Sequence, residues 1–173
     1  RGTSTMSHAS MSQMTTTETE SFLKSVPLFQ SLSESQLRTL INRVGHDEYD
    51  DGHLIIRQGD DGDKFYVIET GEVVVEKDGK ELVRLAQGDF FGERALIKND
   101  KRAASCIAAG PVRCLTVARD VFTQVLSGVK TLLGDYVKTY TDDNQEVLSL
   151  SNFLILFRDI VHKLRLGDES GGK

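Results

Sequence analysis

From about Tyr49 to Val117 the chain alternates short apolar runs with turns built on Gly and Asp. Such runs, rich in Val, Ile, Leu and aromatic residues, are typical of strands, and the Gly and Asp between them favour reversals of the chain. The runs are Leu54–Ile56, Phe65–Ile68, Val73–Val75, Leu82–Leu85, Ser105–Ile107 and Cys114–Val117, and the turns include Thr70-Gly71 and Gly110-Pro111. Many short strands in succession predict an antiparallel β-roll, a jelly-roll-like fold.

Helical patterns flank this region on both sides. A short apolar stretch after Ser21 is ended by Pro27, and Ser33 with Gln36 three residues later is typical of a capping box at a helix start. Helical spacing of apolar residues returns after Ala118. The expected fold class is therefore mostly β with flanking helices: an N-terminal helical segment, a short helix after Gly92, and C-terminal helices.

The domain plan follows from composition along the chain. Residues 1–20 contain no Leu, Ile, Val or aromatic residue, so we expect a disordered tail there, in part an expression remnant. We expect the folded domain over residues 21–145 and an amphipathic C-terminal helix over 146–166. The polar residues 167–173 are expected to form a loose tail. The C-terminal helix is as consistent with packing on its own roll as with contact with a partner.

Charge and cysteine content narrow the class of protein. The 173 residues carry a formal net charge of -5, which argues against a nucleic-acid partner, and no apolar run is long enough to span a membrane. The two cysteines, Cys106 and Cys114, form no disulfide framework. A hairpin at Gly110-Pro111 would place them opposite each other, and the expectation is reduced cysteines in the core or in strands. These features predict a cytoplasmic protein without a membrane or nucleic-acid partner.

One stretch, FFGERALIKNDKRAAS over residues 90–105, interrupts the rhythm of strands and turns. Gly92 permits a tight turn, and the residues after it are good helix formers, so unpaired N–H groups at the helix start form an anion site. Arg102 returns to that place if the intervening loop folds back. Taken alone, this pattern is equally consistent with a solvated turn carrying an exposed arginine.

The wider sequence resembles a known family. The segment FGERALIKNDKRAAS looks like the phosphate-binding cassette of cyclic-nucleotide-binding domains. IIRQGDDGDKFYVIETGEVVV resembles the early strands of that family, and GPVRCLTVARDVFTQVL resembles its last strands and the helix that follows. The resemblance covers roughly residues 22–140, and it is strongest to the regulatory subunits of cAMP-dependent protein kinase.

The resemblance implies a role for each matching residue. Glu93 would accept a hydrogen bond from the ribose 2′-hydroxyl, and Arg102 would bind the cyclic phosphate through charge-assisted hydrogen bonds. The remaining expected positions are Gly92, Ala95, Ala103 and Ala104 for backbone N–H groups around the phosphate, Val75 for the sugar and base pocket, Tyr140 for an aromatic lid over the base, and Leu96 for an allosteric relay to a moving helix.

Residue 103 bears on the identity of the ligand. A Thr or Ser directly after the cassette arginine commonly favours cGMP in this family, whereas Ala103 offers no hydroxyl for the guanine. The expected ligand is therefore cAMP, with cGMP as the alternative, and no cofactor is expected. Arg94 stands where many regulatory subunits carry Leu and cGMP-dependent kinases often carry a basic residue, so it leaves both kinase families open.

The resemblance implies a regulatory sensor rather than an enzyme, with a protein kinase catalytic subunit or domain as its partner. A cGMP-dependent kinase or an exchange-factor fragment is the alternative within the family. A metal-dependent β-roll enzyme is a remote alternative, because the four histidines lack the spacing of a metal site. Lys101 to Ser105 also resembles a basophilic phosphorylation site, which a folded cassette would bury.

Overall fold

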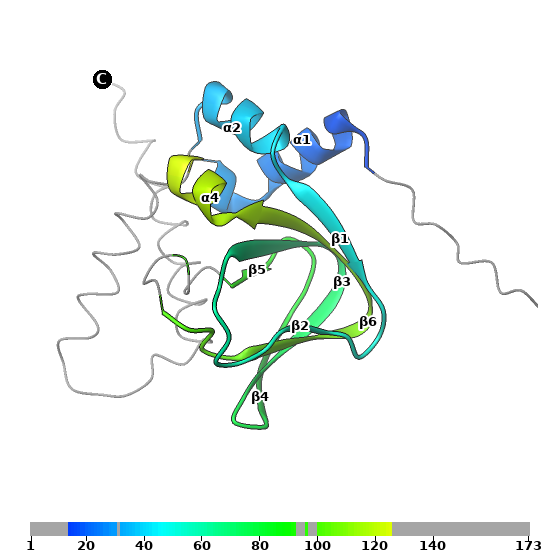
Figure 1. The fold of residues 1–173 in the computed structure, drawn as a ribbon. Coiled ribbons are helices and arrows are strands. Elements are labelled where there is room, and N and C mark those ends of the chain that lie inside the picture. Colours follow the sequence, from blue (N-terminus) through cyan, green and yellow to red (C-terminus); the bar gives the residue numbers. More distant parts are fainter. Residues whose placement is uncertain (1–13, 31, 93–95, 97–99, 126–173) are drawn as a thin grey trace, which may run out of the picture.

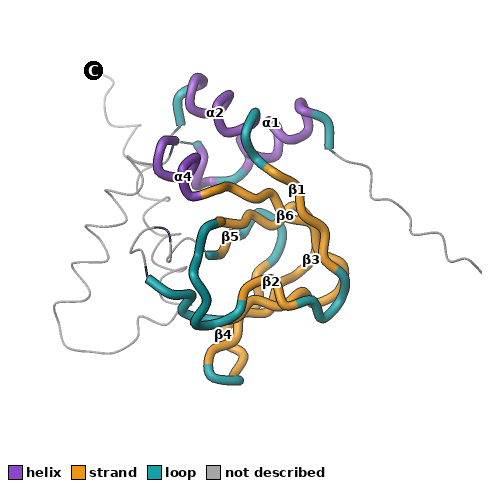
Figure 2. The backbone as a smooth tube through the Cα atoms, viewed as in Figure 1, coloured by secondary structure: helices purple, strands orange, loops and turns teal. Residues whose placement is uncertain are grey.

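The computed structural model describes residues 14–30, 32–92, 96 and 100–125, and Figures 1 and 2 show their arrangement. The described helices are α1 (Thr16–Ser25), the 3-10 helix η1 (Pro27–Phe29), α2 (Glu34–Ile41) and α4 (Arg119–Val125). The described strands are β1 (Gly45–Tyr49), β2 (Leu54–Ile56), β3 (Lys64–Lys77), β4 (Lys80–Leu85), β5 (Phe90–Phe91) and β6 (Ser105–Ala118).

The strands form one antiparallel sheet in the order β1-β6-β3-β4, with β2 also paired to β6 and β5 to β3. Its centre is the long β3–β6 ladder, which runs from the pair Lys64↔Ala118 to the pair Glu76↔Ser105. The sheet curls into a roll, and α1, α2 and α4 gather at one end of it (Figure 1). The predicted β-roll with flanking helices is confirmed.

The two long strands correct the expected positions of the turns. The sequence predicts a turn at Thr70-Gly71 and another at Gly110-Pro111, but β3 and β6 each continue through these positions, with register shifts between Ile68 and Glu72. Gly71 has φ +91°, and a Cβ there would lie 2.3 Å from the carbonyl oxygen of Pro111. Glycine therefore bends the strand at a close crossing instead of ending it.

The same continuity decides where the two cysteines lie: both are strand residues, as expected, and the hairpin alternative is wrong. Cys106 and Cys114 lie on one strand, so they do not face each other across a hairpin. Each instead pairs with β3, Cys106 with Val75 and Cys114 with Ile68, and both side chains are buried. They are part of the packing inside the roll.

Alternation along the strands divides the core into two clusters. On β3, Phe65 and Val67 face the helices, whereas Tyr66 and Ile68 face the inside of the roll. Phe65 is fully buried, and its ring lies 5.6 Å from the rings of Phe90 and Phe122. We call the cluster under the helices the helix-side core and the other the roll core.

The N-terminal helices begin where their caps allow. Helix α2 starts after Ser33, whose hydroxyl accepts from the Gln36 N–H at 3.3 Å while the Gln36 side chain accepts from the Ser33 N–H at 2.9 Å, as predicted. Helix α1 begins at Thr16, and Thr15 with Glu18 forms a second capping box. The expectation of a disordered tail through residue 20 is therefore wrong for residues 16–20, where a cap and the buried Thr19 fix a helix turn without any large apolar residue. None of the described helices is long and apolar enough to cross a membrane.

Candidate functional site

The loops around β5 and before β6 bring together part of the predicted cassette. Gly92 follows β5, and Arg102 with Ala103 and Ala104 precedes β6. Among the predicted site residues, Glu93, Ala95 and Tyr140 lie outside the described residues. The described part of the expected site is therefore its phosphate side.

The side chain of Arg102 turns inward and is only 6% exposed. Its Nη1 donates to the carbonyl oxygen of Gly92 at 2.7 Å, and its Nη2 donates to the carbonyl oxygen of Lys64 at 2.7 Å. Arginine is thus held between the end of β5 and the start of β3. The prediction that Arg102 folds back to Gly92 is confirmed in geometry, and the alternative of an exposed arginine is wrong.

The main chain of Arg102 is held as firmly as its side chain. Its N–H donates to the carbonyl oxygen of Asp60, and its own carbonyl oxygen accepts from the Gly59 N–H, both at 2.8 Å. Next to it, Lys101 Nζ lies 2.5 Å from Asp61 Oδ1 in an exposed ion pair. The loop between β2 and β3 therefore fixes the position from which the guanidinium projects.

The charge of Arg102 lacks a carboxylate partner among the described residues. The hydrogen bonds that its guanidinium makes there go to neutral backbone carbonyls. A buried cation of this kind is costly unless an anion compensates it, and a guanidinium has further N–H donors for a phosphate or carboxylate. The arrangement can accept an anion.

The positive charge of Arg102 affects the pKa of Tyr66. Burial raises the pKa of the Tyr66 hydroxyl, and the positive charge of Arg102 partly opposes that rise. The Tyr66 ring stacks on Phe91 with a centroid distance of 4.9 Å, directly before Gly92. The stacked rings of Tyr66 and Phe91 thus lie next to the turn whose Gly92 carbonyl oxygen binds Arg102.

Gly92 is required by two separate constraints. Its φ is +84°, and a Cβ on it would lie 2.7 Å from Arg102 Nη1 and 3.1 Å from Ile56 Cδ1. The tight turn predicted from the sequence is therefore confirmed. The absent side chain also leaves the space that the guanidinium fills.

The other predicted positions divide between the two cores. Val75 is fully buried and Ala104 is 6% exposed, and both belong to the roll core, while Ala103 is half-buried. Leu96 is 2% exposed and belongs to the helix-side core, together with Val121 and Phe122. The structure thus places Leu96 in the same core cluster as the first helix after the roll.

Sequence reasoning missed the residues that hold Arg102 through their backbones: Gly59, Asp60 and Lys64. Because backbone groups are present at every residue, no side-chain pattern singles these positions out. The one available signal is the Gly- and Asp-rich run over residues 59–63, which indicates a tight loop but not what it contacts.

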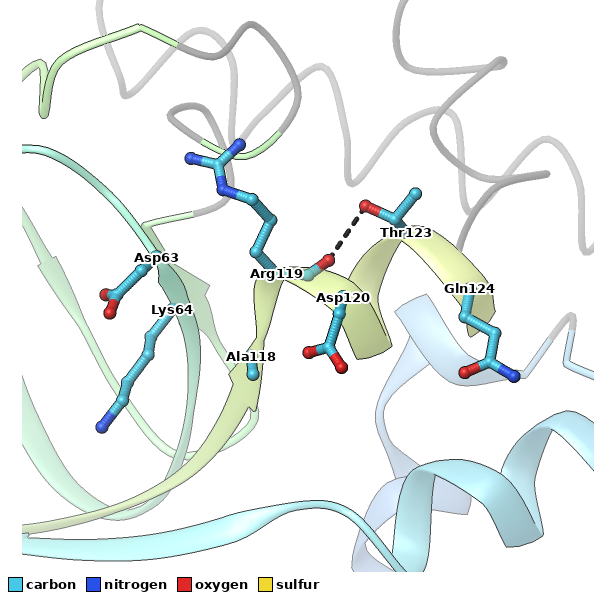
Figure 3. A pocket seen from close by; sticks show the side chains of 7 residues that line it. All are labelled: Asp63, Lys64, Ala118, Arg119, Asp120, Thr123 and Gln124. Atoms are coloured by element: carbon cyan, nitrogen blue, oxygen red, sulfur yellow. Dashed lines mark hydrogen bonds between the residues drawn. The ribbon is translucent and has the colours of Figure 1, made fainter.

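An open hollow lies beside the candidate site, between the start of β3 and α4 (Figure 3). Figure 3 shows Asp63 and Lys64 on one side and Arg119 with Thr123 on the other, and the bond drawn there, from Thr123 Oγ1 to the Arg119 carbonyl oxygen, lies within α4. The Arg119 N–H donates to the carbonyl oxygen of Asp63 at 2.9 Å. This bond to Asp63 ties the start of α4 to the loop that holds Arg102.

No group of three or more His, Cys, Asp and Glu residues in the described part of the chain is arranged to hold a metal ion.

Known proteins resemble this chain in sequence and in fold. Residues 46–128 match the family model described as "Cyclic nucleotide-binding domain". The cGMP-dependent protein kinase egl-4 of Caenorhabditis briggsae is 43% identical over 122 residues, which are 66% of this chain and 16% of that kinase. The chain therefore spans only a small part of this curated relative.

Solved structures give the same fold. The regulatory domain of Toxoplasma gondii PKA with cAMP matches with a TM-score of 0.66 and 30% identity, covering 72% of this chain and 50% of that one. The structure described as Sp-2Cl-cAMPS bound to PKAR CBD2 matches with a TM-score of 0.66 and 28% identity, covering 73% of this chain and 87% of that one.

Proposed function

Residues 46–128 belong to the cyclic nucleotide-binding domain family, and we propose that this chain binds cAMP at the Gly92–Arg102 site and passes the binding event to its C-terminal helices. The observation that carries this proposal is the buried guanidinium of Arg102, whose bonds within the described part of the chain go to backbone carbonyls and to no carboxylate. A singly charged cyclic phosphate supplies the missing anion without the larger desolvation cost of a doubly charged phosphate.

The remaining roles complete the proposal. Glu93 accepts from the ribose hydroxyl, the N–H groups of Ala95, Ala103 and Ala104 surround the phosphate, and Tyr140 covers the base. Val75 lines the pocket from the roll core. These assignments rest on the resemblance of the chain to the family, inside and outside the cassette.

Leu96 is the proposed link to the helices. It packs in the same cluster as Val121 and Phe122 of α4, so a cassette that tightens on phosphate moves a side chain against that helix. The ligand shifts the helix equilibrium only by its difference in affinity for the two states. The proposed output is control of a protein kinase, which the kinase relative and the kinase regulatory domain above support.

The alternative ligand is cGMP. The curated relative named above is a cGMP-dependent kinase, and its identity to this chain is higher than that of the structures with cAMP and with Sp-2Cl-cAMPS. Ala103 favours cAMP, because it lacks the hydroxyl that would bond guanine. A guanine amino group without a partner loses about 1–3 kcal/mol of binding free energy.

Calorimetric and thermal-shift titrations of the whole chain with cAMP, cGMP, adenosine and guanosine test the proposal. We expect cAMP to bind more tightly than cGMP, and both nucleosides to bind far more weakly. Ligand at about 100 times its dissociation constant should stabilise the fold by about 2.7 kcal/mol. Tighter binding of cGMP would replace cAMP with the alternative ligand, and no binding of either cyclic nucleotide would overturn the function.

Arg102→Lys tests the residue that carries the proposal. Lysine keeps the charge but loses the planar pair of donors, so we expect cyclic nucleotide affinity to fall at least tenfold while adenosine affinity is unchanged. Arg84→Lys is the matched control, since Arg84 lies exposed on β4 and binds Glu81. Equal affinity of Arg102→Lys and the unsubstituted chain for cAMP would show that Arg102 does not hold the phosphate.

A further inference from the structure

Gln58 holds the loop whose backbone groups bond to the main chain of Arg102. Gln58 precedes Gly59 and Asp60, whose backbone groups bond to Arg102. The Gln58 N–H donates to Ser105 Oγ at 2.9 Å, at the start of β6. The main chain of Gln58 is therefore fixed to the strand that begins just after the cassette.

The side chain of Gln58 bonds to the β3–β4 turn. Its Nε2 donates to Asp78 Oδ1 at 2.8 Å, and its Oε1 accepts from the Asp78 N–H at 3.0 Å. Because the amide both donates and accepts, its orientation is defined by one residue. This pair joins two loops that are far apart in the sequence.

The partner at the turn is rigid. Asp78 is the only described residue other than glycine with a positive φ, +52°, and Gly79 follows with φ +76°. Two successive residues in this region form the tight turn whose twist matches that of the flanking strands, β3 and β4. The turn therefore offers Gln58 a fixed point on the sheet.

We propose that Gln58 is a positioning residue for Arg102, anchoring the β2–β3 loop to the Asp78 turn so that the guanidinium projects between Gly92 and Lys64. The proposal rests on the function proposed above. A phosphate site must hold its donors to within a fraction of an ångström, and here the backbone of Arg102 is only as fixed as the loop it bonds to.

A variant at Gln58 that only destabilised the fold would lower the midpoint of thermal unfolding, whereas one that mispositions Arg102 would alter the site. Gln58 belongs to neither core cluster, and Asp78 is exposed, so the pair adds little to the burial that stabilises the fold. We therefore expect changes at Gln58 to alter the site more than the midpoint of thermal unfolding.

Exchanging the two side-chain chemistries tests the proposal. Gln58→Glu places a second carboxylate against Asp78, and adding Asp78→Asn to it restores one amide and one carboxylate in the opposite order. Asn followed by Gly also suits the turn at 78–79. Gln87→Glu is the matched control, because Gln87 is exposed in the β4–β5 connection and the same charge is added there.

Two measurements are made on all four proteins, the three variants and the unsubstituted chain. The first is the affinity for cAMP, cGMP and adenosine. The second is hydrogen exchange at the Gly59 and Arg102 amides, which needs no ligand. For Gln58→Glu we expect about tenfold weaker cyclic nucleotide binding, about tenfold faster exchange at both amides and unchanged adenosine affinity, in line with the loss of a hydrogen-bonded pair.

The double variant should recover both readouts, and Gln87→Glu should change neither. Exchange at Gly59 and Arg102 that stays slow in Gln58→Glu would overturn the proposal, as would a double variant no better than Gln58→Glu. If the unsubstituted chain binds no cyclic nucleotide, the proposed function fails, while the exchange measurement still decides whether Gln58 positions Arg102.

Discussion

At the scale of single residues, the site depends on one contact between a glycine and an arginine. Arg102 occupies the space that a side chain at position 92 would fill, and it donates to the carbonyl oxygen of the same glycine. The turn and the anion-binding group are thus built as one unit. A change at either residue must disturb the other.

Gly92→Ala separates the strain of the backbone from the clash with the guanidinium. Gly88 has a similar φ, +87°, but nothing lies within 4 Å of a Cβ there, so Gly88→Ala measures backbone strain alone. We expect Gly88→Ala to lower the free energy of unfolding by about 1–2 kcal/mol, and Gly92→Ala to lower it further and to weaken cyclic nucleotide binding. Urea unfolding and a cAMP titration check this. If Gly88→Ala and Gly92→Ala lost the same stability and the same affinity, the prediction would be contradicted.

The sequence allowed this residue pair to be predicted in kind but not in detail. Gly92 and Arg102 stand out because one permits a special backbone shape and the other binds anions. Lys64 and Gly59 could not be predicted, since they act through a carbonyl oxygen and an N–H that every sequence carries. The role of Gln58 could not be predicted either, because its partner Asp78 is 20 residues away in the sequence and only the fold brings the two together.

At the scale of elements, the three strands β1, β3 and β6 are joined by a buried charged cluster. Glu69 on β3 is 1% exposed, and its Oε2 lies 3.4 Å from Arg113 Nε on β6 and 3.3 Å from His46 Nδ1 on β1. No hydrogen-bond partner among the described residues reaches Glu69 Oε1. Arg113 and His46 thus both approach the same oxygen of this buried carboxylate, and Arg113 supplies a permanent positive charge.

Arg113→Met leaves the Glu69 carboxylate buried without its cation. We expect the free energy of unfolding to fall by about 3–5 kcal/mol, whereas Arg113→Met together with Glu69→Leu should recover most of the loss, because an apolar pair needs no compensation. Chemical unfolding at neutral pH measures both variants. A double variant as unstable as Arg113→Met would show that shape rather than charge decides the effect.

The elements themselves were predicted unevenly. The capping box of α2 depends on neighbouring residues, so the sequence identifies it directly. The long strands β3 and β6 were predicted in fragments, because Gly71 and Gly110 are typical of turns and only the crossing of the two strands shows that they bend instead. The short α1 lacks the apolar pattern that usually indicates a helix before residue 21.

At the scale of the whole molecule, burial in and around the roll core favours the protonated form of one thiol and two tyrosine hydroxyls. Burial raises the pKa of the Cys114 thiol to about 12, with a smaller contribution from the charge of Glu69. Burial likewise raises the pKa of the Tyr49 and Tyr66 hydroxyls. The folded protein therefore holds protons at alkaline pH that the unfolded chain releases.

The protein should lose stability as the pH rises above the ordinary thiol value of about 9. Below that pH both states bind the proton, and between pH 9 and 12 only the folded state binds it, so the free energy of unfolding falls by about 1.4 kcal/mol per pH unit for this thiol. Urea unfolding at pH 8, 9 and 10 checks the slope. Cys114→Ala should flatten it, and an unchanged slope in that variant would contradict the assignment.

The curved β3–β6 ladder also has a consequence for synthesis on the ribosome. Lys64, whose carbonyl oxygen binds Arg102, lies at the end of β3 that pairs with Ala118, the last residue of β6. A nascent chain that has emerged only as far as Ser105 therefore contains the cassette but not the strand that completes the roll around it. We expect nascent chains arrested before Ala118 to bind no cyclic nucleotide, so the ligand can assist folding only after nearly the whole domain has been translated.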